Sequence, residues 1–172
     1  MNTKQEATIE KLNILLNKIT LVSDNVDYLS YQCLDISKNI SAYDCYRMMT
    51  YKQPKWLEIL FRIRDFLGRI VGIRPIKGFD KLDEKDPEIG SLVHFFTVLE
   101  KAEDTLTLNV RDSHLDVCVY LRVVDNNDKN KLYLITSVKN HNFVGKLYML
   151  PVSILHPYIV TNLFKNINID KS

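Results

Sequence analysis

The feature that most restricts the fold is a run of four strand-like segments in the second half of the chain. They are rich in β-branched and aromatic residues with near-alternating polarity, and they cover Leu92 to Glu100, Thr105 to Val110, His114 to Val124 and Lys131 to Asn140. The short turn-forming sequences KAED, RDS and DNNDKN separate them. Because consecutive strands joined by such short turns pair antiparallel, the sequence predicts an antiparallel meander.

Three helices and one further strand are predicted before this meander. A short amphipathic helix opens the chain, with apolar residues at helical spacing at Ile9, Leu12, Leu15, Leu16 and Ile19. The segment Val26 to Ile36 predicts a strand, and Ser41 predicts the N-cap of a helix that runs to about Thr50. Pro54 then opens a longer helix that we expect to stop at Gly72.

The helix after Pro54 has one apolar stripe and one charged face. The apolar stripe consists of Trp56, Ile59, Leu60, Ile63, Leu67 and Ile70. This pattern predicts a helix that packs into the core through the stripe. Arg64 lies at the edge of the stripe, where it is either a snorkelling side chain with a buried stem or an anion-binding arginine that faces a cavity.

The stretch from Leu147 to Phe164 contains no Asp, Glu, Lys or Arg and is about as long as the ~18 residues at which a membrane-spanning helix begins to be considered. Its two prolines interrupt backbone hydrogen bonding, and its polar side chains would lack partners in lipid. We therefore expect no membrane span. We predict instead a C-terminal amphipathic helix whose regular part lies downstream of His156, because Pro157 interrupts regular helix. Leu163 belongs to its apolar side.

Together these elements predict a single α+β domain over residues 1–172, with residues 1–22 as an N-terminal helical extension. A curved antiparallel sheet wraps around a long C-terminal helix, and two helices are inserted between the first strand and the meander, which is the helix-grip arrangement. Such a sheet leaves an apolar cavity beside the helix, which suits a small apolar or amphipathic ligand. The residues expected to bind it are Trp56, Arg64, His156 and Leu163. His156 has an alternative role as a cap of the last helix.

Three sequence blocks carry a family resemblance. The blocks PKWLEILFRIRDFLGRIVGI, DSHLDVCVYLRV and ITSVKNHNFVGKLYMLPVSILHPYIV resemble the bacterial domain-of-unknown-function family 2867, and the likeness covers most of residues 25 to 167. Members resemble the START-like, pollen-allergen-like helix-grip superfamily. Because the domain is often fused behind a short-chain NAD(P)-dependent reductase-like domain, the resemblance implies an accessory module that docks on a reductase-like partner. This chain contains no G-x-G-x-x-G and no such partner domain.

A polar cluster is predicted where the last two long strands begin and end. If their hairpin is symmetric about residues 127 and 128, position 116 faces 139 and His114 faces His141, with Asp112 and Asp116 beside them and Asn142 next in the chain. The cluster is a structural polar network, a partner surface, or a metal-dependent catalytic site. The apolar residues of the same strand alternate with it, so we expect the cluster on the outward face of the sheet.

Composition limits the remaining function classes. The net charge is +2, and no nucleic-acid-binding module is present, so we expect no nucleic-acid partner. The three cysteines are odd in number and lack C-x-x-C spacing, which indicates a reducing cytoplasm and no disulfide framework. No phosphate loop, nucleophile elbow or H-E-x-x-H motif occurs. We therefore expect no cofactor and non-enzymatic binding of a small apolar ligand, with a metal-dependent enzyme as the alternative.

Overall fold

The computed structural model describes residues 2–70, 79 and 86–169, apart from the side chains at 64, 67, 70, 168 and 169. Within these residues the chain forms one six-stranded antiparallel sheet in the order β1-β6-β5-β4-β3-β2 together with four helices. The elements are α1 (Thr3–Leu16), β1 (Tyr28–Ile36), α2 (Ala42–Tyr51), α3 (Lys55–Ile70), β2 (Leu92–Val93), β3 (Phe96–Lys101), β4 (Thr105–Arg111), β5 (Leu115–Val124), β6 (Asn130–Asn140) and α4 (Phe143–Ile169). The predicted α+β fold is confirmed.

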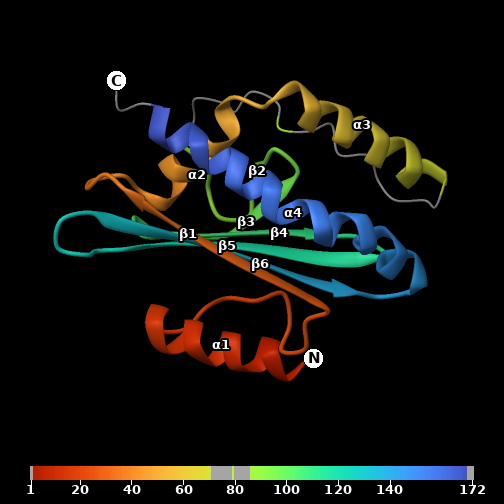
Figure 1. Cartoon of the computed structure of the whole chain (residues 1–172), viewed down its shortest axis with the longest axis horizontal. Coiled ribbons are helices and arrows are strands. Elements are labelled where there is room, and N and C mark those ends of the chain that lie inside the picture. Colours follow the sequence, from red (N-terminus) through yellow and green to blue (C-terminus); the bar gives the residue numbers. More distant parts are fainter. Residues whose placement is uncertain (1, 71–78, 80–85, 170–172) are drawn as a thin grey trace.

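Both faces of the sheet are covered, as Figure 1 shows. On one face α2 and α4 pack over apolar residues that alternate along the strands, among them Leu108, Leu121 and Leu132. On the other face α1 packs through Leu12 and Leu16 in a core cluster that also contains Tyr120 and Ile135. The face that we expected to point outward is therefore partly covered by α1.

The strand pairing confirms the predicted meander and its register. In the β5–β6 hairpin Val124 faces Lys131 and Asp116 faces Lys139, as expected from a turn centred on residues 127 and 128. The predicted strand from Leu92 to Glu100 is wrong in its continuity, because His94 and Phe95 form a turn between β2 and β3. His94 has a φ of 56°, in the left-handed region, which ends the regular strand there.

Helix α4 is longer than its sequence predicts. It begins at Phe143, because the Asn142 side chain accepts a hydrogen bond from the Gly145 amide at 3.1 Å in the manner of an N-cap. It then continues through Pro151 and Pro157, so the prediction of a regular helix only downstream of His156 is wrong. An internal proline costs about 3 kcal/mol in an isolated helix. Burial of Met149, Val160 and other residues on the sheet-facing side of α4 offsets that cost.

Helix α3 does not pack into the core through its predicted stripe. Of that stripe, Trp56, Ile59 and Ile63 are 39%, 55% and 49% exposed, so this prediction is wrong for these residues. Leu57, one position away from Trp56, is 1% exposed and belongs to the main core cluster. Helix α3 is thus buried along a different side at Leu57, and Trp56, Ile59 and Ile63 are left facing solvent. The predicted stop at Gly72 lies outside the described residues.

Candidate functional site

The polar cluster predicted from the β5–β6 register forms at the start of α4. The backbone amide of His141 donates to the His114 carbonyl at 2.9 Å, so these two residues are neighbours as predicted. The His114 ring nitrogen Nδ1 lies 3.0 Å from the Asn142 side-chain Nδ2, and His141 Nε2 lies 3.1 Å from Asp116 Oδ1. Asp112 accepts a hydrogen bond from the Ser113 hydroxyl.

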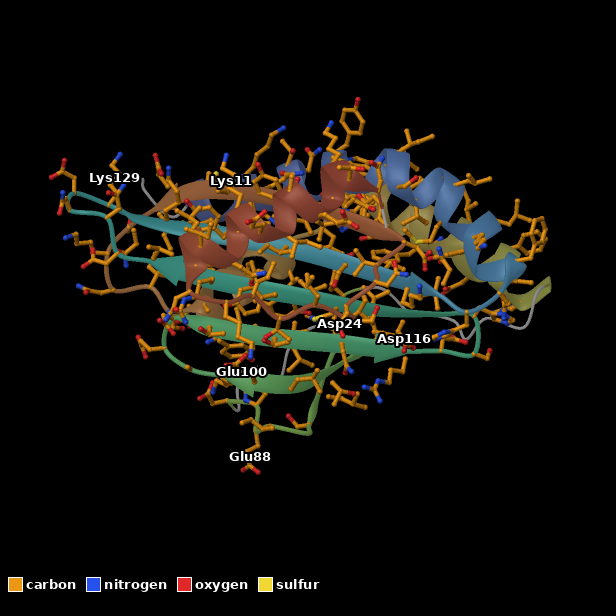
Figure 2. All side chains as sticks on the ribbon, turned by 90° about the horizontal axis from the view of Figure 1, so that it is seen from below. Lys11, Asp24, Glu88, Glu100, Asp116 and Lys129 are labelled. Atoms are coloured by element: carbon orange, nitrogen blue, oxygen red, sulfur yellow. The ribbon has the colours of Figure 1, made fainter. Side chains whose placement is uncertain are left out.

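These contacts make the cluster a joint between the sheet and α4. Asn142 caps the helix and also donates to the Ser113 carbonyl at 3.2 Å, which ties the start of α4 to the β4–β5 turn. The histidines lie in two separate pairs, His114 with Asn142 and His141 with Asp116. Figure 2 shows Asp116 near the end of the sheet, beyond the part that α1 covers. Among the described residues, no group of three or more His, Cys, Asp or Glu side chains is placed to hold a metal ion.

A second polar group lies under α4, against the edge strand β1. The Tyr28 hydroxyl is 3.4 Å from His156 Nδ1, and the two rings meet edge to face with their centroids 5.9 Å apart. His156 therefore faces the sheet from the middle of α4, and its alternative role as a helix cap is wrong. Burial raises the pKa of Tyr28, with a partly offsetting hydrogen bond to the Ser30 side chain. The phenol therefore keeps its proton and remains a hydrogen-bond donor at neutral pH.

Two hydroxyl residues extend this group along the sheet. Ser30 of β1 is paired with Thr136 of β6, so both side chains share the face that α4 covers. Thr136 is 3% exposed, yet its Oγ1 has no hydrogen-bond partner among the described residues. A buried hydroxyl without a partner costs about 1 to 3 kcal/mol. Thr136 therefore provides a hydrogen-bonding group that the folded chain itself leaves unused.

Apolar side chains surround this polar group. Tyr28 packs against the core cluster of Leu115, Val138 and Met149, which lies between the first half of α4 and the sheet. Gln32, further along β1, donates to the Pro157 carbonyl at 2.8 Å. This hydrogen bond connects β1 to α4 on the C-terminal side of His156. We call Tyr28, Ser30, Thr136 and His156 the polar group under α4. It combines a few polar atoms with an apolar surround, which is the usual composition of a small-molecule site.

Burial lowers the pKa of His156 from 6.5 to about 4, because the imidazolium form is disfavoured away from water. The unfolded chain thus takes up a proton between about pH 6.5 and about pH 4 that the folded chain does not, and stability falls over that window. We expect the wild-type chain to lose about 2 to 3 kcal/mol more unfolding free energy between about pH 7 and about pH 4 than a His156→Gln variant does. Urea unfolding at the two pH values measures the difference. Equal pH dependence of wild type and His156→Gln would contradict the prediction.

Comparison with known protein families matches residues 22–163 to the family described as Protein of unknown function (DUF2867). The match covers most of the chain. This chain belongs to the DUF2867 family. A comparison with curated proteins finds no match. The helix-grip superfamily stays a prediction, while the arrangement of sheet and helices is the one expected for it.

The four residues expected to bind ligand occupy different environments in this DUF2867 chain. His156 lies in the polar group under α4, and Leu163 is 5% exposed in the main core. Trp56 lies on the exposed stripe of α3. The Arg64 side chain lies outside the described residues. Among the three of these residues whose side chains the structure describes, His156 is the one in the polar group under α4.

Sequence reasoning missed Tyr28, Ser30 and Thr136 as members of this group. A signal was present in β1, where the positions that face α4 are Tyr28, Ser30 and Gln32 before they become apolar at Leu34 and Ile36. Polar residues at core-facing strand positions indicate either a buried hydrogen-bond network or a binding site. The signal was hidden because the face to which each β1 residue points depends on pairing with β6, which is distant in the sequence.

Proposed function

We propose that this protein binds a small apolar or amphipathic molecule, such as a lipid or a polyketide-like metabolite, between α4 and the β1 edge of the sheet. The observation that carries the proposal is the buried Thr136 hydroxyl, which has no partner within the described chain and lies across from Ser30 on the face of the sheet that α4 covers. An oxygen or nitrogen of the ligand would satisfy it. The apolar body would contact the Leu115, Val138 and Met149 cluster.

The chemistry of the group favours a ligand with an uncharged polar function. His156 is neutral at physiological pH because its pKa lies near 4, and the tyrosine and the two hydroxyl groups are neutral as well. Such groups exchange hydrogen bonds with an alcohol, a carbonyl or an amide. A carboxylate or phosphate would have to be desolvated beside neutral partners, which costs far more than an uncharged group does.

A Thr136→Val substitution tests whether the Thr136 hydroxyl binds a ligand or has a purely structural role. Valine keeps the shape but removes the unpaired hydroxyl, so we expect the free protein to become more stable by about 1 kcal/mol. Loss of a hydrogen bond to bound ligand is expected to weaken binding by about tenfold. Nile red, an uncharged apolar dye with a carbonyl acceptor, serves as the probe in a fluorescence titration. Native mass spectrometry of the protein purified from its own host tests for a retained molecule.

Thr107→Val is the matched control. Thr107 is as deeply buried, but it lies on the opposite face of the sheet, where its hydroxyl donates to Glu100 at 2.9 Å. This variant should lose stability and keep its affinity for the dye. Unchanged dye affinity in Thr136→Val, with the expected gain in stability, would show that the hydroxyl serves no ligand and would overturn the proposed site.

The sequence also suggests two other functions. A metal-dependent enzyme needs His114, His141, Asp112 and Asp116 to converge, whereas the structure holds the two histidines in separate pairs that connect α4 to the sheet. Docking on an NAD(P)-dependent reductase-like partner through the outward polar face stays a prediction. Helix α1 occupies part of that face, so such a partner would have to contact the uncovered strands at its end.

A further inference from the structure

The outward side of α4 is apolar along more than half of the helix. Phe143, Leu147, Leu150, Ile154 and Tyr158 follow one another at helical spacing, and they are between 53% and 76% exposed. The opposite side of the same helix is buried against the sheet at Met149, Val160 and Leu163. A helix that only covers a sheet has a polar outer side. The apolar outer side of α4 therefore needs a different explanation.

Helix α3 adds a second exposed apolar stripe. Trp56, Ile59, Ile63 and Phe66 are between 39% and 67% exposed. Figure 1 shows α3 and α4 on the same side of the sheet, opposite α1, and Figure 2 shows both helices extending toward the same end of the molecule. We call the exposed apolar residues of the two helices the α3–α4 face. Its residues are Trp56, Ile59, Ile63, Phe66, Phe143, Leu147, Leu150, Ile154 and Tyr158.

The charges on these two helices are mostly positive. Helix α4 contains Lys146 and Lys165 and no acidic residue, and the two helices together hold six Lys and Arg against two Asp and Glu. The whole chain, by contrast, has 23 basic and 21 acidic residues, so the excess of positive charge is concentrated here. Lys55, Arg62 and Arg69 recur at seven-residue intervals along one flank of the α3 stripe, and all three are exposed.

We propose that the α3–α4 face docks on the surface of a lipid bilayer that contains anionic lipids. An exposed apolar stripe with tryptophan and phenylalanine, flanked by Lys and Arg, is the pattern of helices that lie in the membrane interface. Anionic headgroups attract the basic flank, and the apolar side chains enter the boundary of the acyl chains. The proposal rests on this face alone and does not depend on the proposed ligand.

The charge pattern favours a lipid surface over a second copy of the chain as the partner of the α3–α4 face. Two α3 helices packed antiparallel through their stripes would bring Lys55, Arg62 and Arg69 of one copy next to the same three residues of the other. Like charges at such positions oppose association. An anionic bilayer, in contrast, compensates all of them at once.

Helix α4 lies on the bilayer in this proposal and does not cross it. The segment Phe143–Ile167 is long and apolar enough to cross a membrane by length and composition, the one such segment in the described part of the chain. A crossing would require its buried side, with Met149, Val160 and Leu163, to leave the sheet. Docking through the outer side keeps that core intact and still buries the apolar stripe.

The test uses vesicles and the single tryptophan of the chain. Trp56 belongs to the α3–α4 face and is the only Trp in the sequence, so its fluorescence reports on this surface. We expect the protein to float with phosphatidylcholine vesicles that contain phosphatidylglycerol, and Trp56 emission to shift to shorter wavelength. Lipids brominated in the acyl chain should quench it. Binding should weaken as salt rises from about 0.1 M to about 1 M, because the Debye length falls from about 10 to about 3 Å.

Substitutions on the α3–α4 face, compared with control substitutions on α1, test which surface of the protein binds the vesicles. Ile63→Asp combined with Ile154→Asp is expected to reduce vesicle binding by tenfold or more, since each change places a charge at the boundary with the acyl chains. Ile14→Asp is the matched control, because Ile14 is 80% exposed on α1, across the sheet from the α3–α4 face. Arg62→Gln should weaken binding to anionic vesicles about fivefold, whereas Lys11→Gln on α1 should leave it unchanged.

Each result supports or overturns the proposal. Equal binding to vesicles of phosphatidylcholine alone, absence of quenching by brominated lipid, or an equal loss in Ile14→Asp would overturn it. A dimer in solution that dissociates in the Ile63→Asp and Ile154→Asp variant, without vesicle binding by the wild type, would assign the face to a second copy. The Thr136→Val variant should bind vesicles as the wild type does, so failure of this proposal and failure of the ligand site are distinguished.

Discussion

Leu163→Ala is expected to lower the free energy of unfolding by about 2 to 5 kcal/mol. Leu163 is 5% exposed and belongs to the main core cluster, which joins α4 to α2 and to the apolar face of the sheet. Removal of its side chain leaves a cavity in that core, and the lost contacts add to the lost transfer free energy. The expected loss is a large share of the about 5 to 15 kcal/mol that stabilises a typical domain. Urea unfolding followed by circular dichroism measures it.

Leu150→Ala is the matched control on the same helix. Leu150 is 62% exposed on the outer side of α4, so the same truncation removes few contacts. We expect a change within about 0.5 kcal/mol. Similar losses for Leu150→Ala and Leu163→Ala would show that the two sides of α4 do not differ in burial, which would contradict the packing described above.

Gly145→Ala is expected to destabilise the protein by about 3 kcal/mol, although alanine is the better helix former. A Cβ at Gly145 would lie 2.2 Å from the His114 carbonyl oxygen and 3.1 Å from its carbon. These are backbone atoms, held by the His141 amide, so they do not move aside as the end of a flexible side chain would. The helix propensity of alanine offsets only about 1 kcal/mol.

The neighbouring Lys146→Ala substitution controls for helix propensity. Lys146 is exposed in the same turn of α4, and we expect its replacement to change the unfolding free energy by less than about 0.5 kcal/mol. Thermal unfolding of both variants makes the comparison. If Gly145→Ala were as stable as the wild type, α4 would not approach the β4–β5 turn as closely as the structure shows.

The joint at the start of α4 explains why the chain contains both a D-x-H-L-D segment, at residues 112–116, and an H-N-x-x-G segment, at residues 141–145. Asn142 caps the helix, its side chain also meets His114, and Gly145 allows the helix to approach the His114 carbonyl. The D-x-H-L-D and H-N-x-x-G segments are therefore two sides of one contact. This contact fixes where α4 begins, and so where His156 faces β1 and where the apolar side chains of α4 face solvent.

The meander was predictable because its signals are local. Alternating side chains and short polar turns determine the pairing of β5 with β6, and the turn centred on residues 127 and 128 predicted the pairs of Val124 with Lys131 and Asp116 with Lys139. The Ser41 cap of α2 followed from one side chain and its own backbone. The family resemblance was likewise contained in continuous blocks of sequence, and the match over residues 22–163 confirms it.

The orientation of the helices and the location of the candidate site depend on contacts between distant segments. The stripe of α3 predicts an apolar side, but only the packing of Leu57 decides that Trp56 and Ile63 remain exposed. The prolines of α4 predict a late helix start, but the cap at Asn142 and burial against the sheet outweigh their cost. The polar group under α4 unites residues of β1, β6 and α4, as far as 128 positions apart for Tyr28 and His156. By itself the sequence determined most of the elements and their order, because hydrogen bonding and periodicity act locally. The tertiary structure alone decided which side of α3 is buried and where α4 begins, because both depend on the shape of the surface on which the helix packs.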